Sequence, residues 1–81
     1  MRFKLYNDVV LARDVPDENL FAGDVGTVVE RHEIVGHETG YSVEFFDMLG
    51  NTVAVATLPA SALRIPTHND RPAVRPERVT A

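Results

Sequence analysis

The sequence contains no cysteine, no tryptophan and no apolar run long enough to cross a membrane. Without cysteine there is neither a disulfide framework nor a thiolate metal site, and such a composition is typical of a reducing compartment. An apolar signal core is also missing, because Asn7 and Asp8 soon interrupt the apolar pair Phe3 and Leu5. We therefore expect a cytoplasmic protein without a membrane segment, and a chain of 81 residues allows one domain with a small core.

Positive charge is scarce, and the formal net charge is −4. Residues 1–64 carry ten Asp and Glu against five Lys and Arg, whereas residues 65–81 carry two against three. Nucleic-acid binding depends largely on Lys and Arg that displace counterions from the phosphates. The acidic body therefore argues against nucleic acid as the partner of the main domain.

Short segments rich in β-branched residues, separated by turn-forming residues, predict an all-β domain. The sequence predicts strands at residues 5–13, 24–33, 41–45, 52–58 and 63–66, a loop at residues 14–19, and one 3-10 turn at residues 59–63. The third strand alternates strictly, so Tyr41, Val43 and Phe45 share one side, and Phe46 leaves the core. This pattern predicts a small five-stranded SH3-like barrel over residues 1–65.

Glycines mark the entry to the second strand and the turn of the later hairpin. Gly23 lets the chain turn sharply out of the first loop. Gly26 lies where a strand must bend or another backbone must approach closely, so folding alone accounts for both glycines, and contact with a ligand is the alternative. Gly50 and Asn51 are suited to positive φ in a tight turn at residues 47–51.

The final segment, residues 66–81, contains Pro66, Pro72 and Pro76 and few large apolar side chains. This composition predicts an extended or disordered tail. Its basic residues are Arg71, Arg75 and Arg78. These arginines can pair with the acidic body of the same chain or of a neighbouring chain, and the second arrangement predicts a homodimer; a solvated tail is the alternative.

Candidate partner-binding residues lie in the first loop and at the end of the third strand: Asp14, Asp17, Glu18, Phe21 and Phe46. Acidic side chains in a loop attract a basic peptide and raise its rate of association. Exposed aromatic side chains are enriched among the residues that dominate interfaces. The alternatives are a solubilising acidic surface and a Phe46 that caps one end of the barrel.

His32 and His37 flank the connector between the second and third strands, and imidazole is a common ligand of transition metals. A third ligand is not evident, so solvated loop histidines are the alternative. No phosphate loop, nucleophile elbow or zinc motif occurs, and no His, Ser or Lys accompanies the loop carboxylates as an acid or base. We expect a protein that is not an enzyme and that uses no cofactor or metal.

Several spaced motifs resemble a small bacterial family of unknown function. These motifs are Asp8–Val10, Asp14–Pro16, Gly23–Glu30, Tyr41–Asp47 and Gly50–Ala54, with Leu58 and Leu63, and together they span residues 5–65. The resemblance implies an SH3-like barrel without an established activity. Some members are encoded beside toxin-like or uncharacterised proteins, which implies an antitoxin-like or accessory role for a protein-binding module.

Two wider resemblances concern the barrel alone. The spacing of Gly23, Gly26 and Val28 is similar to the KOW element of ribosomal and transcription-elongation proteins, and the whole barrel is similar to the β-subunit domain of nitrile hydratases. This chain departs from KOW barrels by being acidic where they are basic. The leading hypothesis is thus a non-catalytic protein-binding module, and the alternatives are a KOW-like nucleic-acid-binding barrel and a small-ligand or metal-binding protein.

Overall fold

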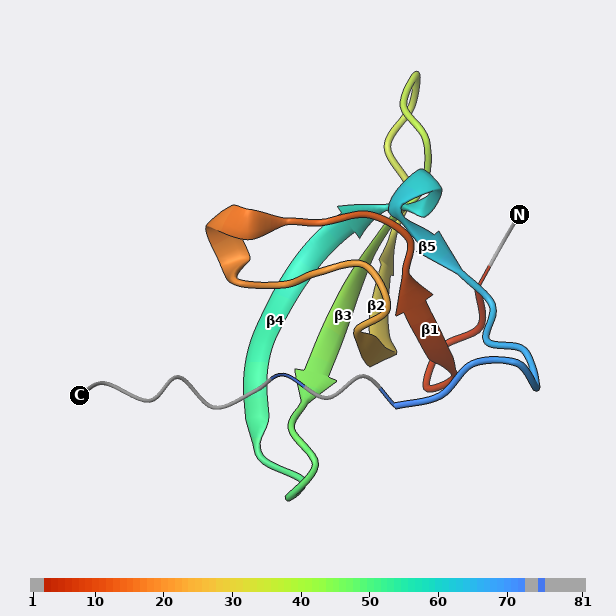
Figure 1. Ribbon diagram of the computed structural model, residues 1–81. Helices are drawn as coiled ribbons and strands as arrows, with labels where there is room; N and C mark the ends of the chain where they lie inside the picture. The colour runs from red at the N-terminus through yellow and green to blue at the C-terminus, as the bar shows by residue number, and fades with distance from the viewer. Residues whose placement is uncertain (1–2, 73–74, 76–81) are drawn as a thin grey trace.

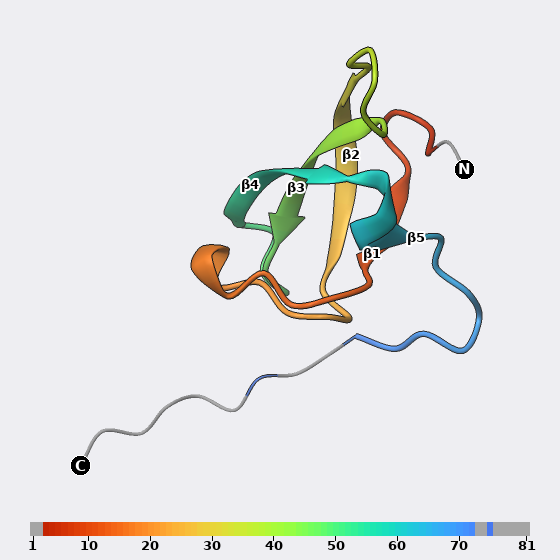
Figure 2. The same ribbon diagram turned by 90° about the horizontal axis from the view of Figure 1, so that it is seen from above.

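The computed structural model describes residues 3–72 and 75 of the chain. In chain order its elements are β1 (Asp8–Leu11), η1 (Pro16–Glu18), β2 (Val25–His32), β3 (Gly40–Phe46), β4 (Thr52–Pro59), η2 (Ala60–Ala62) and β5 (Leu63–Arg64), where η marks a 3-10 turn. The strands form one antiparallel sheet in the order β4-β3-β2-β1-β5. Figures 1 and 2 show this sheet curled over on itself, with β4 and β5 as its two edges.

The predicted all-β fold is confirmed, including the 3-10 turn that comes directly before the last strand. The five strands and their order are those of a small SH3-like barrel, here a curled half-barrel with open edges. In the described part of the chain, no helical segment has the length and apolar character that a bilayer crossing needs.

Strand β2 joins the two halves of the curled sheet. It pairs with β1 through Val25, Gly26 and Thr27, and with β3 from Gly26 to His32. The register against β3 shifts between Val28 and Glu30, which is the signature of a β-bulge. A bulge bends its strand and increases the local twist, so β2 can follow β1 at one end and β3 at the other.

The core fills the inside of the curl with side chains from every strand, from the N-terminal segment, from the first loop and from η2. Its members are Phe3, Val9, Leu11, Leu20, Val28, Tyr41, Val43, Phe45, Ala56, Leu58, Ala62 and Leu63. The predicted alternation along β3 is confirmed, since Tyr41, Val43 and Phe45 are buried while Phe46 is 42% exposed.

The close approach that was predicted at Gly26 is also confirmed. A Cβ atom built on Gly26 would lie 2.5 Å from Cγ1 of Val43 and 2.9 Å from the carbonyl oxygen of Glu44. Gly23 has a φ of 97°, as a sharp turn out of the first loop requires. The two glycines therefore serve different purposes, one steric and one conformational.

The predicted first strand, residues 5–13, is too long. Leu5 and Tyr6 form a turn in which Tyr6 has a φ of 66°, and regular strand pairing begins only at Asp8. Because positive φ is incompatible with extended backbone, the chain turns here and brings Phe3 back onto the core. The Phe3 ring packs edge-on against the Tyr41 ring, with ring centroids 5.3 Å apart. The backbone N–H of Phe3 donates to the Tyr41 hydroxyl at 3.0 Å.

The prediction of positive φ at Asn51 is wrong, although it is right for Gly50, whose φ is 86°. Asn51 acts through its side chain, because Nδ2 donates to Oδ2 of Asp47 at 3.1 Å. Oδ1 of Asp47 accepts the backbone N–H groups of Leu49 and Asn51, both at 2.9 Å. The carboxylate of Asp47 thus organises the turn between β3 and β4.

The close approach at Gly26 predicts that Gly26→Ala lowers the free energy of unfolding by about 1–3 kcal/mol, because the added methyl group must displace Val43 or the backbone of β3. Gly40→Ala is the matched control, since a Cβ there meets nothing nearer than 3.8 Å and the change should stay within about 0.5 kcal/mol. Urea unfolding of both variants measures the difference. Equal stability of the two variants would contradict the steric account of Gly26.

Candidate functional site

The first loop is closed into a narrow hairpin by its own backbone. Val15 and Leu20 exchange N–H···O hydrogen bonds of 2.8 and 3.2 Å, and Asn19 between them adopts a φ of 55°. The Leu20 side chain is buried in the core and fixes the loop to the barrel. The tip of this hairpin is the 3-10 turn η1, which the sequence predicted only as an irregular loop.

Two carboxylates hold the return of the first loop toward β2. Oδ1 of Asp14 accepts the N–H of Ala22 at 2.9 Å, and Oδ2 of Asp24 accepts the N–H of Phe21 at 2.9 Å. Asp24 in turn donates its own N–H to the Phe21 carbonyl at 3.0 Å. The carboxylate of Asp14 is therefore committed to the shape of the loop, a contact that the sequence did not indicate.

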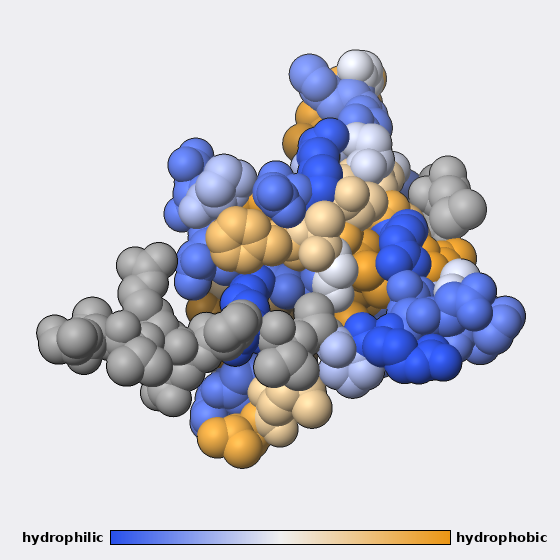
Figure 3. All heavy atoms as spheres, in the orientation of Figure 1, coloured by the Kyte–Doolittle hydropathy of each residue, from blue (hydrophilic) through white to orange (hydrophobic). Residues whose placement is uncertain are grey.

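A groove of about 370 Å³ lies between the first loop and the hairpin that joins β3 to β4. We call it the loop–hairpin groove. Its lining comes from Glu18–Leu20, Gly23–Val25, Phe45–Met48, Val53–Ala54, Pro72 and Arg75. Figure 3 shows hydrophobic side chains at the tip of the β3–β4 hairpin, at the bottom of the view, and Phe46, Met48 and Val53 are all more than 40% exposed.

The candidate residues fall at different places around this groove. Glu18 and Phe46 line it directly, and Phe21 contacts the lining residue Arg75. Asp17 lies in η1 beside Glu18 but outside the lining, and Asp14 holds the base of the loop. The structure therefore brings three of the five candidates to one groove.

Arg75 and Asp24 are groove residues that the candidate set lacked. The Arg75 guanidinium forms an ion pair with Oδ2 of Asp24, and its Cζ atom lies 5.0 Å from the centre of the Phe21 ring. A tail arginine thus pairs with the acidic body of its own chain, one of the arrangements predicted above. The two residues are 51 positions apart, so no local pattern could connect them.

A turn at the start of the tail brings the chain back from β5, and the sequence did not predict it. Arg64 donates from Nη1 and Nη2 to the two carboxylate oxygens of Asp70, at 2.9 and 2.6 Å. Oδ2 of Asp70 also accepts the N–H of Thr67 at 2.6 Å. These hydrogen bonds hold the pKa of the Asp70 carboxyl well below its ordinary value. The side chain of Arg64 has the largest effect, and the N–H of Thr67 has the next largest. Pro76 and Arg78 of the predicted tail lie outside the described residues.

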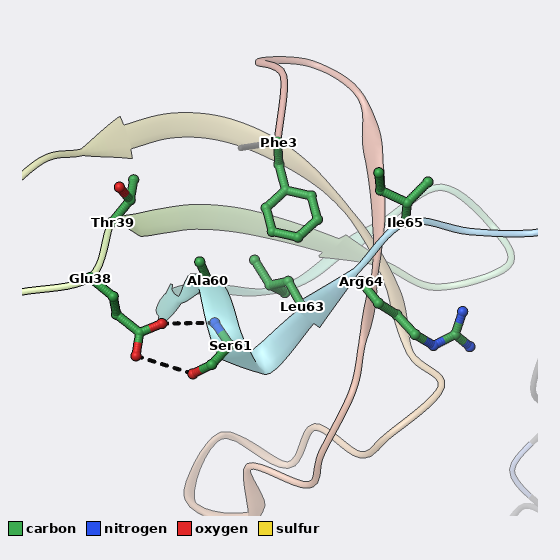
Figure 4. A pocket seen from close by; sticks show the side chains of 8 residues that line it. All are labelled: Phe3, Glu38, Thr39, Ala60, Ser61, Leu63, Arg64 and Ile65. Carbon is green, nitrogen blue, oxygen red and sulfur yellow. Dashed lines mark hydrogen bonds between the residues drawn. The ribbon is translucent and has the colours of Figure 1, made fainter. Parts of the chain in front are cut away.

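A second hollow, of about 640 Å³, lies between η2, the N-terminal segment and the connector that follows β2 (Figure 4). Its apolar wall is formed by Phe3, Ala60, Leu63 and Ile65. The carboxylate of Glu38 accepts the N–H and the hydroxyl of Ser61, and Arg64 is bound to Asp70, so both charged groups are occupied within the chain. This hollow offers apolar contact without a free charged group.

The histidines of the metal-site alternative lie in different surroundings. Nε2 of His32 is 2.8 Å from Oγ of Ser42, which is 3.0 Å from Oγ1 of Thr57, so His32 belongs to a polar row across β2, β3 and β4. His37 lies in the connector turn, where its N–H donates to Ile34. The described part of the chain contains no group of three or more His, Asp or Glu residues arranged to hold a metal.

A family model described as "Domain of unknown function (DUF4926)" matches residues 5–65. The chain belongs to this family. The matched region contains all seven elements found in the described part of the chain and ends before Asp70 and Arg75, which lie in the tail. No curated protein and no solved structure matches the chain. The resemblance to a family of unknown function, inferred from the spaced motifs, is therefore confirmed.

The lowered pKa of Asp70 predicts how the tail turn responds to acid. The ionised Asp70 carboxylate stabilises the tail turn fully at any pH above the ordinary Asp pKa. This stabilisation is lost only as the pH falls through the lowered pKa of Asp70. Titration of the Asp70 carboxyl carbon by NMR should give a midpoint below that of a free aspartate, and Arg64→Ala should raise it. The control is Arg71→Ala, because Arg71 contacts only carbonyl oxygens in this turn. An ordinary midpoint in the wild-type chain would contradict the Arg64–Asp70 contact.

Proposed function

We propose that this chain is a non-catalytic module that binds a protein partner in the loop–hairpin groove. The observation that carries the proposal is the exposure of Phe46, Met48 and Val53 in a groove that also contains the carboxylates of Glu18 and Asp24. Protein interfaces combine a few apolar or aromatic anchors with a polar rim. The groove has both parts, and the two elements that form it are each fixed by internal hydrogen bonds.

The chemistry of the lining supports binding rather than catalysis. The described lining residues include no His, Ser, Cys or Lys that could act with the carboxylates as nucleophile or base. Asp47 is occupied by the backbone of its own turn, and these hydrogen bonds, above all that from Asn51, lower its pKa. A carboxylate held in this way is a poor proton acceptor, so its role is structural.

The acidic lining also favours a protein partner over nucleic acid. The charged lining residues are Arg75 and the three carboxylates of Glu18, Asp24 and Asp47. The carboxylates outnumber the arginine, so the groove would repel phosphates and attract a basic protein segment. The biological form that we propose is an antitoxin-like or accessory partner of a neighbouring gene product in the cytoplasm. The family resemblance and the absence of cysteine support this form.

The test is affinity capture from a nuclease-treated lysate of the cells that make the protein, with Phe46→Asp as the variant. Because Phe46 is 42% exposed, this change should leave the barrel folded while it places a charge in the apolar part of the groove. We expect a protein band with the wild-type chain and a loss of about tenfold or more with the variant. Identification of the band by mass spectrometry names the partner.

The matched control is Val35→Asp, which adds the same charge at a position that is 99% exposed in the connector between β2 and β3. This control should retain the band, and circular dichroism checks that both variants are folded. Equal capture by all three chains would refute the groove as the binding site. Failure of the wild-type chain to capture any protein would refute the module itself.

A further inference from the structure

We propose that the loop–hairpin groove recognises an arginine side chain of an extended partner segment, and that Arg75 occupies this arginine subsite in the free chain. The inference rests on the proposed function and names the chemistry of the partner. The subsite consists of the Asp24 carboxylate and the Phe21 ring, the two groups that the Arg75 guanidinium contacts.

The subsite is organised by the first loop itself. Oδ2 of Asp24 accepts the Phe21 N–H at 2.9 Å, and the Phe21 carbonyl accepts the Asp24 N–H at 3.0 Å. These reciprocal hydrogen bonds lie within the first loop, do not involve Arg75, and fix the carboxylate relative to the backbone that carries the ring. With Arg75 in place, 17% of the Asp24 side chain is exposed, so Asp24 is the more buried partner of the ion pair. A binding group that is already ordered loses less entropy when its ligand arrives.

The pair of contacts favours a guanidinium over an ammonium group. Arg75 uses an N–H group of its guanidinium to reach Asp24 while its Cζ atom lies 5.0 Å from the centre of the Phe21 ring. A planar guanidinium can stack on a ring and donate sideways at the same time, whereas a lysine ammonium is a compact point charge. The subsite therefore predicts a preference for arginine.

The remainder of the groove suits the backbone and neighbouring side chains of an extended segment. Pro72 lines the groove together with Arg75, so the chain already places a proline three residues before its arginine there. Phe46 and Val53 offer apolar contact beyond the subsite. Glu18 makes no side-chain hydrogen bond to another described residue and is available to a second basic group.

The contact made by Arg75 is weak enough to be replaced. Half of the Arg75 side chain remains exposed, and exposed ion pairs contribute little to stability because water screens them. A partner segment that adds apolar contacts in the groove can therefore displace Arg75. As long as Arg75 occupies the subsite, only a fraction of the chains can bind a partner segment. The apparent affinity for that segment is reduced by the same fraction.

The test uses the full-length chain and a peptide probe, acetyl-Pro-Ala-Val-Arg-Pro-amide, whose sequence is that of residues 72–76. Backbone amide shifts of Phe21, Ala22 and Asp24 are followed by NMR as the peptide is added up to millimolar concentrations. Arg75→Ala should bind the peptide several-fold more tightly than the wild-type chain, because its subsite is vacant. A peptide with lysine in place of arginine should bind about tenfold more weakly.

Asp24→Asn, introduced together with Arg75→Ala, removes the charge but keeps an oxygen that can accept the Phe21 N–H. This double variant should lose about tenfold in peptide affinity. Asp8→Asn in the same Arg75→Ala background is the matched control, since Asp8 lies in β1 outside the groove lining and its Oδ1 also accepts a hydrogen bond, from the Thr27 hydroxyl. This control should bind the peptide normally.

Three results would overturn the inference: no shift at these amides in Arg75→Ala, equal binding of the lysine peptide, or unchanged binding after Asp24→Asn. These results are separate from the capture experiment. Loss of the partner by Phe46→Asp together with failure of the arginine peptide would leave the proposed function intact and reject only the arginine subsite. Binding of the peptide without capture of any partner would reject the proposed function.

Discussion

The fold depends on the close approach of β2 and β3 at Gly26, where a side chain of any size would collide with Val43 and with the backbone of β3. Gly26 lies opposite Val9 in β1 and opposite Phe45 in β3, so three strands meet at this position. A sheet of five short strands can enclose a core only by curling strongly, and the bulge between Val28 and Glu30 bends β2 close to this position. The loop–hairpin groove lies next to this junction, because it is lined by Val25, the neighbour of Gly26, and by Phe45, its partner in β3.

The groove in turn depends on carboxylates that act inside the protein. Asp14 and Asp24 hold the first loop, Asp47 holds the β3–β4 turn, and Asp70 holds the turn after β5. Part of the acidic excess of this chain is therefore structural, because these groups replace regular strand pairing in the connections. Composition alone suggested a solubilising surface. It could not distinguish exposed carboxylates that keep the protein soluble from carboxylates that hold loops and turns in place.

Local pattern predicted most of the fold and little of the site. The alternation of Tyr41, Val43 and Phe45 gave the buried face of β3 because strand geometry repeats every two residues. The turn at Tyr6 was missed because nothing in its neighbours requires positive φ. The pairing of Arg75 with Asp24 joins residues 51 positions apart, so it could be found only in three dimensions.

The burial of Tyr41 has a consequence for the spectroscopy of this protein. The chain has no tryptophan and only two tyrosines. Tyr6 is 74% exposed, whereas Tyr41 is buried against Phe3. The Tyr41 hydroxyl accepts a hydrogen bond from the backbone N–H of Phe3. Near-ultraviolet circular dichroism arises from aromatic side chains in fixed, asymmetric packing and vanishes when that packing is lost. The tyrosine band of the native protein therefore comes mainly from Tyr41, which serves as an intrinsic probe at the centre of the barrel without any introduced label.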